Sequence, residues 1–227
     1  RNWPNAIGMG RKLLSEGIGT LLLLTIVVGS GIMGERLSGG NSAIALLSNT
    51  LATACGLYVL INLLGPISGA HFNPLVSMMA WQDRSIDGST LLALMTAQLG
   101  GGLLGVGLAH LMFELPLMQW GIHTRTGMAQ WLAEAVATAG LILTIRLFSE
   151  HRPTQVAAGV ACYIAAAYWF TASTSFANPV VTIARSFTAT FSGIYPADVP
   201  GFVAAQIFGA FTGYWLAKQL KAEALSS

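Results

Sequence analysis

Two Asn-Pro dipeptides are the features of this chain best placed to do chemistry. Asn73-Pro74 and Asn178-Pro179 each interrupt an apolar stretch of sequence. Asparagine is a favoured helix N-cap and proline suits the first helical position, so each pair predicts the start of a helix. A helix N-terminus carries roughly half a positive charge. The chemistry that these pairs offer is therefore electrostatic, acting on whatever lies in front of the two N-termini.

The helices that follow are expected to be short. Apolar sequence continues only over 75–81 after the first proline and over 180–184 after the second, which is about two helical turns each. A single Asn-Pro pair also occurs at ordinary helix starts outside a membrane. Two copies, each flanked by apolar sequence, favour a pair of half-helices instead.

Half-helices that enter a membrane from opposite faces bring their N-termini together near its centre, where the two dipoles oppose the passage of cations. Irregular backbone at that depth is tolerated only where it lines a cavity or is buried in protein. We therefore predict that the residues before each cap turn their carbonyl groups toward an aqueous path. These residues are Gly69, Ala70, His71, Phe72, Thr174, Ser175, Phe176 and Ala177.

The composition requires a membrane around these elements. Hydrophobic residues make up 54% of the 227 residues and charged residues 9%, against about 25% charged residues in soluble domains. Apolar runs recur at 13–34, 43–64, 89–113, 128–148, 154–174 and 199–217. Each is long enough to cross a hydrocarbon core of about 30 Å. We expect an all-α membrane protein with six transmembrane helices, the first of them a span and not a cleaved signal.

The distribution of charge predicts an orientation. Most basic residues fall near the two ends of the chain and in the even-numbered loops, namely Arg1, Arg11, Lys12, Arg84, Arg146, Arg152, Lys218 and Lys221. Because such residues are retained on the cytoplasmic side, both termini are expected to be cytoplasmic. The net charge of +2 points to no particular partner, and no pattern typical of nucleic-acid binding is present. Cys55 and Cys162 are expected to be buried small residues and not metal ligands.

The sequence predicts a single domain, 1–227, that contains two copies of one unit, residues 11–113 and 128–217. Glu16 and Glu134 stand in matching places near the start of each copy, and Gln98 and Gln206 near the end. With three spans per copy, the second must enter the membrane from the opposite side, which makes an inverted repeat. A carboxyl group within a span is expected to have a polar partner or a functional role.

Glycine spacing also repeats. Gly101 and Gly105 in the third span match Gly209 and Gly213 in the sixth. Small residues four apart let helices approach closely in lipid, where packing drives association. The matched copies favour a packing role over simple flexibility.

Taken together, these motifs resemble the aquaporin and aquaglyceroporin family over essentially the whole chain. The resemblance is carried by Ser68-Gly69-Ala70-His71-Phe72-Asn73-Pro74, by Phe176-Ala177-Asn178-Pro179, and by the paired glutamate and Ala-Gln helices. It implies six transmembrane helices plus two re-entrant half-helices that form a passive pore. It also implies that Asn73 and Asn178 donate N–H groups to the permeating molecule at the pore midplane, and that Glu16 and Glu134 hold the loops that lead to Pro74 and Pro179.

The sequence departs from the family at its narrowest point. An arginine usually stands three residues after the second Asn, where this chain has Val181. The other three filter positions of the family fall at Thr53, Ala166 and Ser175, so every filter side chain is expected to be small. Arg185 lies one helical turn beyond Val181; it either faces the outer vestibule or is a surface cation that extends toward water.

A filter of this composition is expected to admit more than a single file of water. Small polyols and uncharged metalloid hydroxides such as arsenous acid, and methylated arsenicals, suit a row of carbonyl groups that faces apolar walls. Val in place of Arg resembles the bacterial aquaglyceroporins associated with arsenic resistance. The alternatives are a mainly water-conducting aquaporin and a secondary transporter, although the expected pore has no carboxylate suited to ion coupling.

An intramembrane enzyme would need a positioned acid, base, nucleophile or metal. His71 is the histidine nearest the path, and it either lines the inner mouth or is a satisfied core histidine. We expect no enzyme activity, no cofactor and no metal. The expected partners are the lipid bilayer and small neutral solutes, and the family resemblance implies a homotetramer. The expected location is a plasma membrane, the bacterial inner membrane.

Overall fold

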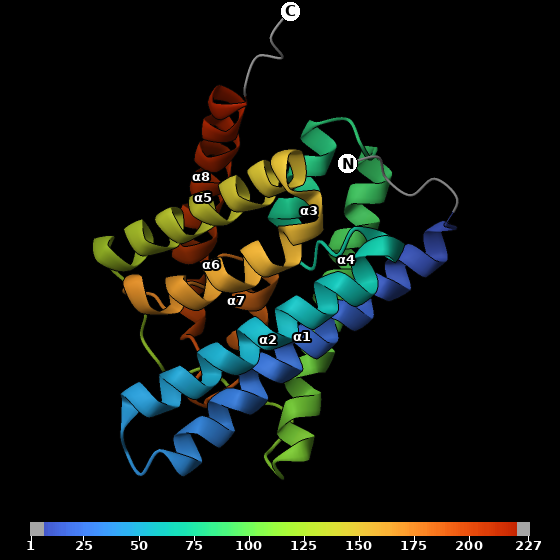
Figure 1. Cartoon of the computed structure of the whole chain (residues 1–227). Coiled ribbons are helices and arrows are strands. Elements are labelled where there is room, and N and C mark those ends of the chain that lie inside the picture. The colour runs from blue at the N-terminus through green and yellow to red at the C-terminus, as the bar shows by residue number, and fades with distance from the viewer. Residues whose placement is uncertain (1–6, 222–227) are drawn as a thin grey trace, which may run out of the picture.

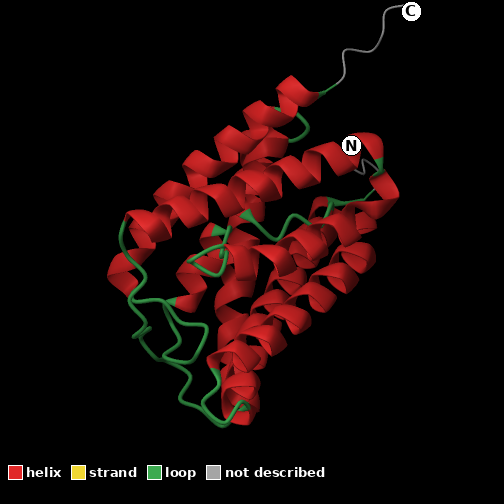
Figure 2. Cartoon of the chain, turned by 60° about the vertical axis from the view of Figure 1, so that its left-hand side comes forward, coloured by secondary structure: helices red, strands yellow, loops and turns green. Residues whose placement is uncertain are grey.

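The structure of the chain, a computed structural model, describes residues 7–221 and is helical, without strands in that range (Figures 1 and 2). Its helices are α1 (Met9–Leu37), α2 (Ser42–Ser68), α3 (Pro74–Gln82), α4 (Gly88–Met112), α5 (Met128–His151), α6 (Val156–Phe170), α7 (Pro179–Arg185) and α8 (Val199–Leu220). Short 3-10 turns at Pro153–Gln155 and Pro196–Asp198 precede α6 and α8. Six long helices and two short ones that begin at Asn-Pro are the elements that the sequence predicts.

The long helices differ in how clearly they meet the requirements of a membrane span. Within the described residues, α1, α2, α4 and α5 are long and apolar enough to cross a membrane, judged by length and composition alone. Helix α6 has only 15 residues, or about 22 Å of helix. The chain continues from α6 through an extended segment into α7, so this part of the second half crosses with irregular backbone as well as helix.

The two halves of the chain pack in equivalent ways. Helix α1 lies against α2 and α4, and in the second half α5 lies against α6 and α8. Helix α2 contacts α6 across the halves, and the short helices α3 and α7 touch each other inside the bundle. Figure 1 shows α1 and α2 running side by side across the front of the molecule. This is the arrangement expected of an inverted repeat, with the half-helices at its centre.

The glycines matched between the halves stand where helices approach most closely. A Cβ atom on Gly101 would collide with the backbone carbonyl of Gly17, and one on Gly209 with that of Ala135. One turn further along, a Cβ atom on Gly105 would collide with the backbone carbonyl of Leu21, and one on Gly213 with that of Ala139. Only a residue without a side chain allows these contacts, so the pairs α1–α4 and α5–α8 depend on them.

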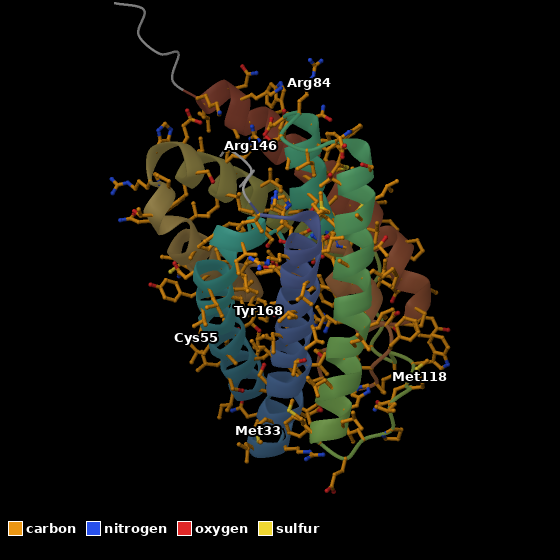
Figure 3. The ribbon with its side chains drawn as sticks, turned by 90° about the vertical axis from the view of Figure 1, so that its right-hand side faces the viewer. Met33, Cys55, Arg84, Met118, Arg146 and Tyr168 are labelled. Atoms are coloured by element: carbon orange, nitrogen blue, oxygen red, sulfur yellow. The ribbon has the colours of Figure 1, made fainter. Side chains whose placement is uncertain are left out.

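Charged residues gather toward one end of the bundle. Arg84 and Arg146 lie toward one end in Figure 3, and Met33 and Met118 toward the other. Tyr214, near the end of α8, donates a hydrogen bond to Asp83 at 2.8 Å. Arg146 also donates to Asp83, so the last turns of α8 lie at the same end of the bundle as Arg146. The chain termini themselves lie outside the described residues, so the cytoplasmic placement of both remains a prediction.

One expectation about the cysteines is wrong. Cys55 and Cys162 are free and exposed, not buried; Figure 3 shows Cys55 on the outside of the bundle. A helix that crosses a membrane has an apolar surface on its lipid side as well as in its core, so apolar sequence did not distinguish the two.

The glycine contacts give a test of the packing. Gly101→Ala is expected to destabilise the protein by about 1–3 kcal/mol, because the added methyl group must push α4 away from α1. Gly100→Ala, in the same helix, places its methyl group in open space and should be neutral or slightly stabilising, because alanine favours helix. Thermal unfolding in detergent measures both. Equal stability of the two variants would argue against the close-contact role.

Candidate functional site

Each half-helix is capped by its own asparagine. Asn73 accepts a hydrogen bond from the Leu75 N–H at 3.0 Å. Asn178 accepts from the N–H groups of Val180 and Val181 at 3.0 and 3.3 Å. The prolines stand at the first helical position in both helices. These caps use the side-chain oxygens and leave both side-chain NH2 groups free to donate elsewhere.

The two asparagines also bind the opposite half of the chain. Asn73 Nδ2 donates to the carbonyl of Ala177, and Asn178 Nδ2 donates to the carbonyl of Phe72, each at 2.8 Å. The two half-helices therefore meet N-terminus to N-terminus through a reciprocal pair of bonds. An amide NH2 has two hydrogens, and each of these groups uses one of them in the pair. Both asparagines line the cavity described below, so the second hydrogen of each can face a molecule there.

The loops before the caps are held in an unusual conformation. Ala70 and Phe72 in the first loop, and Ser175 and Ala177 in the second, have φ between 48° and 53°. Residues with side chains adopt this left-handed region only at a cost of roughly 1 kcal/mol or more each. The same conformation recurs at matching positions before each cap, so the interactions that maintain it are expected to recur as well.

The buried carboxylates of Glu16 and Glu134 provide those interactions. Glu16 accepts from the backbone N–H groups of His71 and Phe72 at 2.8 and 2.7 Å. Glu134 accepts from the N–H groups of Phe176 and Ala177, both at 2.9 Å. With these N–H groups bonded to glutamate, the carbonyl groups of the loops are left to face the cavity.

A glutamine fixes each glutamate in turn. Gln98 donates to Glu16 and to Ser77, at 2.9 and 3.0 Å. Gln206 makes the same pair of bonds in the second half, to Glu134 at 2.6 Å and to Thr182 at 2.8 Å. Both glutamines come from the last long helix of their half, so each carboxylate ties a loop, a half-helix and two long helices together.

A cavity of about 440 Å³ runs past this centre. Thr174 does not line it, but the other seven loop residues predicted to do so lie along its surface: Gly69, Ala70, His71, Phe72, Ser175, Phe176 and Ala177. His71 is partly buried and lines the cavity, and its Nδ1 lies 3.0 Å from Ser77 Oγ.

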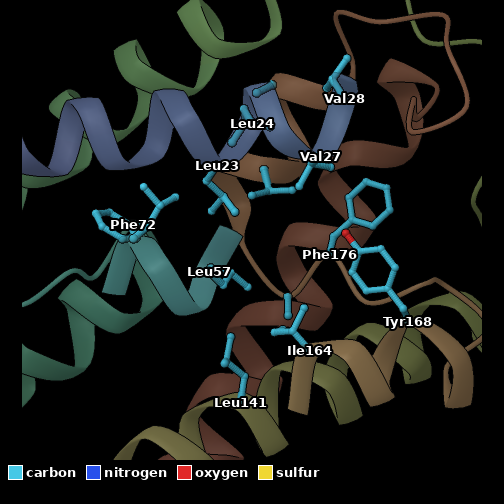
Figure 4. Packing of buried hydrophobic residues seen from close by; sticks show 14 of the residues in the cluster. Leu23, Leu24, Val27, Val28, Leu57, Phe72, Leu141, Ile164, Tyr168 and Phe176 are labelled. Carbon is cyan, nitrogen blue, oxygen red and sulfur yellow. The ribbon is translucent and has the colours of Figure 1, made fainter. Parts of the chain in front are cut away.

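Apolar side chains form the opposite wall. Leu23, Leu57, Leu141 and Ile164 come from α1, α2, α5 and α6 and all line the cavity (Figure 4). They belong to the main cluster of buried hydrophobic residues. A molecule in the cavity therefore meets hydrogen-bonding groups on one side and hydrocarbon on the other, which suits small neutral solutes with several hydroxyl groups.

Three of the four predicted filter residues lie along the cavity, and Ala166 does not. Thr53, Ser175 and Val181 line it, whereas the side chain of Ala166 is exposed on the outside of α6. Tyr168 lines the cavity instead, and its hydroxyl lies 3.4 Å from Thr53 Oγ1. The expectation that every filter side chain is small is therefore corrected.

A signal for Tyr168 was present in the sequence. Val156, Val160, Ile164 and Tyr168 follow one another at intervals of four along α6, and all four line the cavity. Counting back from Asn178 missed this because the extended segment between α6 and the second cap has no helical periodicity. The spacing of the large side chains identifies the inward face of the helix better than the count does.

Arg185 is a cavity residue and not a surface cation. Its side chain is only 2% exposed and lines the cavity. The guanidinium carbon lies 3.4 Å from the centre of the Phe176 ring, and Nε donates to the carbonyl of Ser192. Stacking on an aromatic face and a carbonyl acceptor together stabilise a buried guanidinium. The alternative of an arginine that extends to the surface is thus excluded.

Sequence reasoning did not identify a second inward-facing arginine, the partly buried Arg125 in the loop before α5. It donates from Nε and Nη1 to the carbonyls of Gly193 and Ser173, at 3.0 and 3.2 Å. Its guanidinium carbon lies 5.1 Å from the centre of the Phe176 ring. Burial lowers the pKa of Arg125, and the charge of Glu134 partly offsets this. The available signal was a basic residue on the side of the membrane where few are expected.

At the other end of the cavity, charged side chains are paired. Arg146 donates to both carboxylate oxygens of Asp83, at 2.6 and 3.2 Å, and stacks on the Tyr214 ring at 4.3 Å. Partial burial raises the pKa of Asp83, but the hydrogen bonds from Arg146 and Tyr214 and the nearby positive charges outweigh it, so the net shift is downward. Glu150 pairs with Lys221 at 2.7 Å. Among the described residues, no group of three His, Cys, Asp or Glu side chains could hold a metal ion.

Fold and site together define a membrane channel built from an inverted repeat with two opposed half-helices. Residues 5–153 match the model of the Major intrinsic protein family. The chain is also 50% identical over 200 residues to "Aquaglyceroporin AqpS" of Rhizobium meliloti (strain 1021), a match that covers 88% of this chain and 85% of that protein. The chain belongs to the Major intrinsic protein family. Members of this family are channels and not enzymes, so the protein is a multi-pass membrane channel for small neutral solutes.

More distant relatives are consistent with this. "Probable aquaporin PIP2-8" of Arabidopsis thaliana is 31% identical over 154 residues, covering 65% of this chain and 54% of that protein. The X-ray structure of the aquaglyceroporin from Plasmodium falciparum has a TM-score of 0.71 with this chain and covers 94% of it and 97% of that chain, at 16% identity. At this identity the likeness is one of fold, and it supports the aquaporin fold predicted from sequence.

The buried carboxylates provide a test of the site. Glu134→Gln is expected to destabilise the protein by about 1.5–3 kcal/mol, because the side-chain NH2 would face a backbone N–H that now has a carboxylate acceptor. Solute permeation should fall with it, since the second loop loses its support. Glu35→Gln changes an exposed carboxylate in α1 and serves as the control. Thermal unfolding and water permeation in vesicles measure both variants, and a Glu134 variant as stable and permeable as the control would contradict the assigned role.

Proposed function

We propose that the protein is a passive channel for glycerol-like polyols, arsenous acid and its methylated forms, and water. The observation that carries this proposal is the apolar side chain of Val181, which lines the cavity where related channels usually carry a fixed arginine. Thr53 and Ser175 line the same cavity, and their side chains are small and offer only weak hydrogen-bonding groups. Neutral solutes larger than water fit such a lining.

Electrostatics favour neutral solutes over ions. The N-termini of α3 and α7 meet at the centre, and each contributes roughly half a positive charge there. The reciprocal asparagines add hydrogen-bond donors and no negative charge. An uncharged solute with several oxygens can accept from these donors, whereas a cation meets an electrostatic barrier.

The charged residues along the cavity do not favour a secondary transporter. Ion coupling needs a carboxylate that is free to bind and release an ion. The two carboxylates that line the cavity, Asp83 and Glu150, are each paired with a cation. The buried carboxylates Glu16 and Glu134 bond to the loops, and that of Asp198 accepts from the backbone N–H of Arg125 at 2.6 Å.

One observation favours a second candidate, a mainly water-conducting channel. Tyr168 and Arg185 both line the cavity, and both are larger than the side chains expected there. If these side chains stay in place during permeation, they narrow the path, Tyr168 at the level of Thr53. The relative named as an aquaglyceroporin is 50% identical, which supports the wider channel. A panel of solutes distinguishes the two candidates.

We also propose a homotetramer in a bacterial inner membrane, with both termini cytoplasmic. Basic residues at the end of the bundle that holds Arg84, Arg146 and Lys218 support this orientation. Large apolar side chains are exposed along the long helices, among them Leu22, Leu51, Leu104 and Leu132. They suit contact with lipid or with further copies of the chain.

Val181→Arg tests the main proposal. A charged and bulky side chain at this position should slow the permeation of glycerol and arsenous acid about tenfold relative to water. A steric clash or a lost hydrogen bond that raises the barrier to permeation by ~1.4 kcal/mol has that effect. Stopped-flow light scattering on vesicles that contain the purified protein measures water, glycerol and urea, and chemical assay of uptake measures arsenous acid. A wild-type protein that passes water but neither glycerol nor arsenous acid would establish the second candidate.

Tyr168→Ala tests which residue of α6 faces the path. Removal of the phenol is expected to lower the barrier to glycerol by ~1 kcal/mol and so to raise glycerol permeation several-fold. The effect on water permeation should be smaller. Ala166→Val, two residues earlier on the exposed side, is the matched control and should leave both rates unchanged. The same stopped-flow comparison applies. If the Ala166 variant altered solute selectivity and the Tyr168 variant did not, the assignment would be reversed.

A further inference from the structure

Large apolar side chains are exposed on the loop that joins α4 to α5. Leu117, Met118, Trp120 and Ile122 are 52%, 73%, 64% and 65% exposed. The chain is not helical at these residues, so they are not part of the apolar span that α4 forms. An exposed apolar patch of this kind marks a contact with a partner or with lipid.

Side chains along this loop alternate between an inward and an outward face, as in extended chain. Gln119, Gly121 and His123 are partly or fully buried, whereas the residues on either side of each are exposed. The Gly121 N–H donates to the Ser186 carbonyl at 2.8 Å, and the His123 carbonyl accepts from the Tyr195 N–H at 2.8 Å. The inward face is therefore bound to the segment that follows α7, and the outward face meets whatever surrounds the bundle.

The outward face changes in character along the loop. Met118, Trp120 and Ile122 are apolar, but the next two exposed positions on this face carry the hydroxyl groups of Thr124 and Thr126. Water alone gives no reason for such a gradient, whereas a segment that leaves a membrane passes from hydrocarbon to water. Tryptophan is also enriched at the membrane–water boundary. The order of the side chains thus indicates that the loop emerges from lipid toward residue 126.

The start of the loop lies at a depth where lipid surrounds the helices. A Cβ atom on Gly102 would lie 2.7 Å from Val180 Cγ1, so this turn of α4 is level with the start of α7 and the centre of the pore. The Leu117 side chain would lie 4.0 Å from a Cβ atom on Gly107, and the Leu117 carbonyl lies 3.1 Å from His110 Nδ1. These two residues of α4 stand about 7.5 and 12 Å beyond Gly102 along the helix. Half of a hydrocarbon core is about 15 Å.

The loop therefore turns back along α4 instead of extending into water. Figure 3 shows Met118 at the side of the bundle and not beyond its end. The carbonyl of Pro116 accepts a hydrogen bond from Gln119 Nε2 at 2.9 Å, which satisfies a backbone group that lipid could not. Helix α4 exposes Leu104 and Leu111, so the apolar patch of the loop continues the exposed apolar surface of the helix.

We propose that Leu117, Met118, Trp120 and Ile122 form an anchor that inserts into the outer part of one lipid leaflet, with acyl chains as its partner. The inward face of the same loop bonds to the residues just after α7, next to Arg185, which lines the cavity. The bilayer thereby holds in place the loop that borders this end of the pore. This contact does not depend on which solute the channel conducts.

Spin labels distinguish lipid from water at this loop. In a chain that carries Cys55→Ala and Cys162→Ala, a nitroxide is attached to Met118→Cys and the purified protein is placed in vesicles. Electron paramagnetic resonance measures how often the label collides with oxygen, which dissolves in hydrocarbon, and with a polar nickel complex, which is excluded from it. The ratio of oxygen to nickel collisions should be several-fold higher than at Thr126→Cys, on the same face of the loop, and close to that at Leu104→Cys in α4.

Three other results would overturn the anchor. A ratio at Met118 as low as that at Thr126 would place the loop in water. Exclusion of both reagents, with dipolar broadening between labels that disappears on dilution with unlabelled chains, would show that a second copy covers the patch. Exclusion of both without broadening would show that the label packs against its own chain. If the Met118 variant does not fold, Ile122→Cys decides by the same comparison with the same controls.

Discussion

The structure depends on two buried carboxylates that bond to the backbone N–H groups of the two loops before the caps. A pore at the centre of a membrane needs carbonyl groups turned toward its path, and such backbone leaves its N–H groups without partners. Glu16 and Glu134 accept those N–H groups, and Gln98 and Gln206 hold the carboxylates in place. Left-handed residues in both loops persist because these bonds outweigh their conformational cost. The half-helices, the reciprocal asparagines and the row of carbonyls all follow from this support.

The two halves are alike where they build the pore and differ where they set its selectivity. The contacts of the paired glutamates, glutamines, asparagines and glycines recur in both halves, with partners at equivalent positions. The cavity near Thr53 has no such symmetry, since Tyr168 comes from α6 and Arg185 from the end of α7. Residues that bond to the loops and half-helices cannot be replaced without loss of the fold. Side chains that only line the cavity can change while the fold is kept. Differences between related channels are therefore expected at these positions.

Much of the architecture could be predicted because it rests on local rules. The Asn-Pro caps, the length of the half-helices and the paired glutamates are readable from residue type and spacing. The inward face of α6 was misassigned, because the extended segment before Asn178 gives no period from which to count. The two cysteines were placed inside for a related reason, since a helix in lipid is apolar on all sides.

The sequence by itself determined the inverted repeat, the six long helices, the two opposed half-helices and the absence of an arginine three residues after Asn178. Only the tertiary structure decided which side chains reach the path. Arg185 could have extended to the surface or turned inward, and the ring of Phe176 and the carbonyl of Ser192 fix it inside. The sequence shows an arginine one turn beyond Val181, but its partners lie outside α7, so no local pattern could reveal that its side chain faces the cavity.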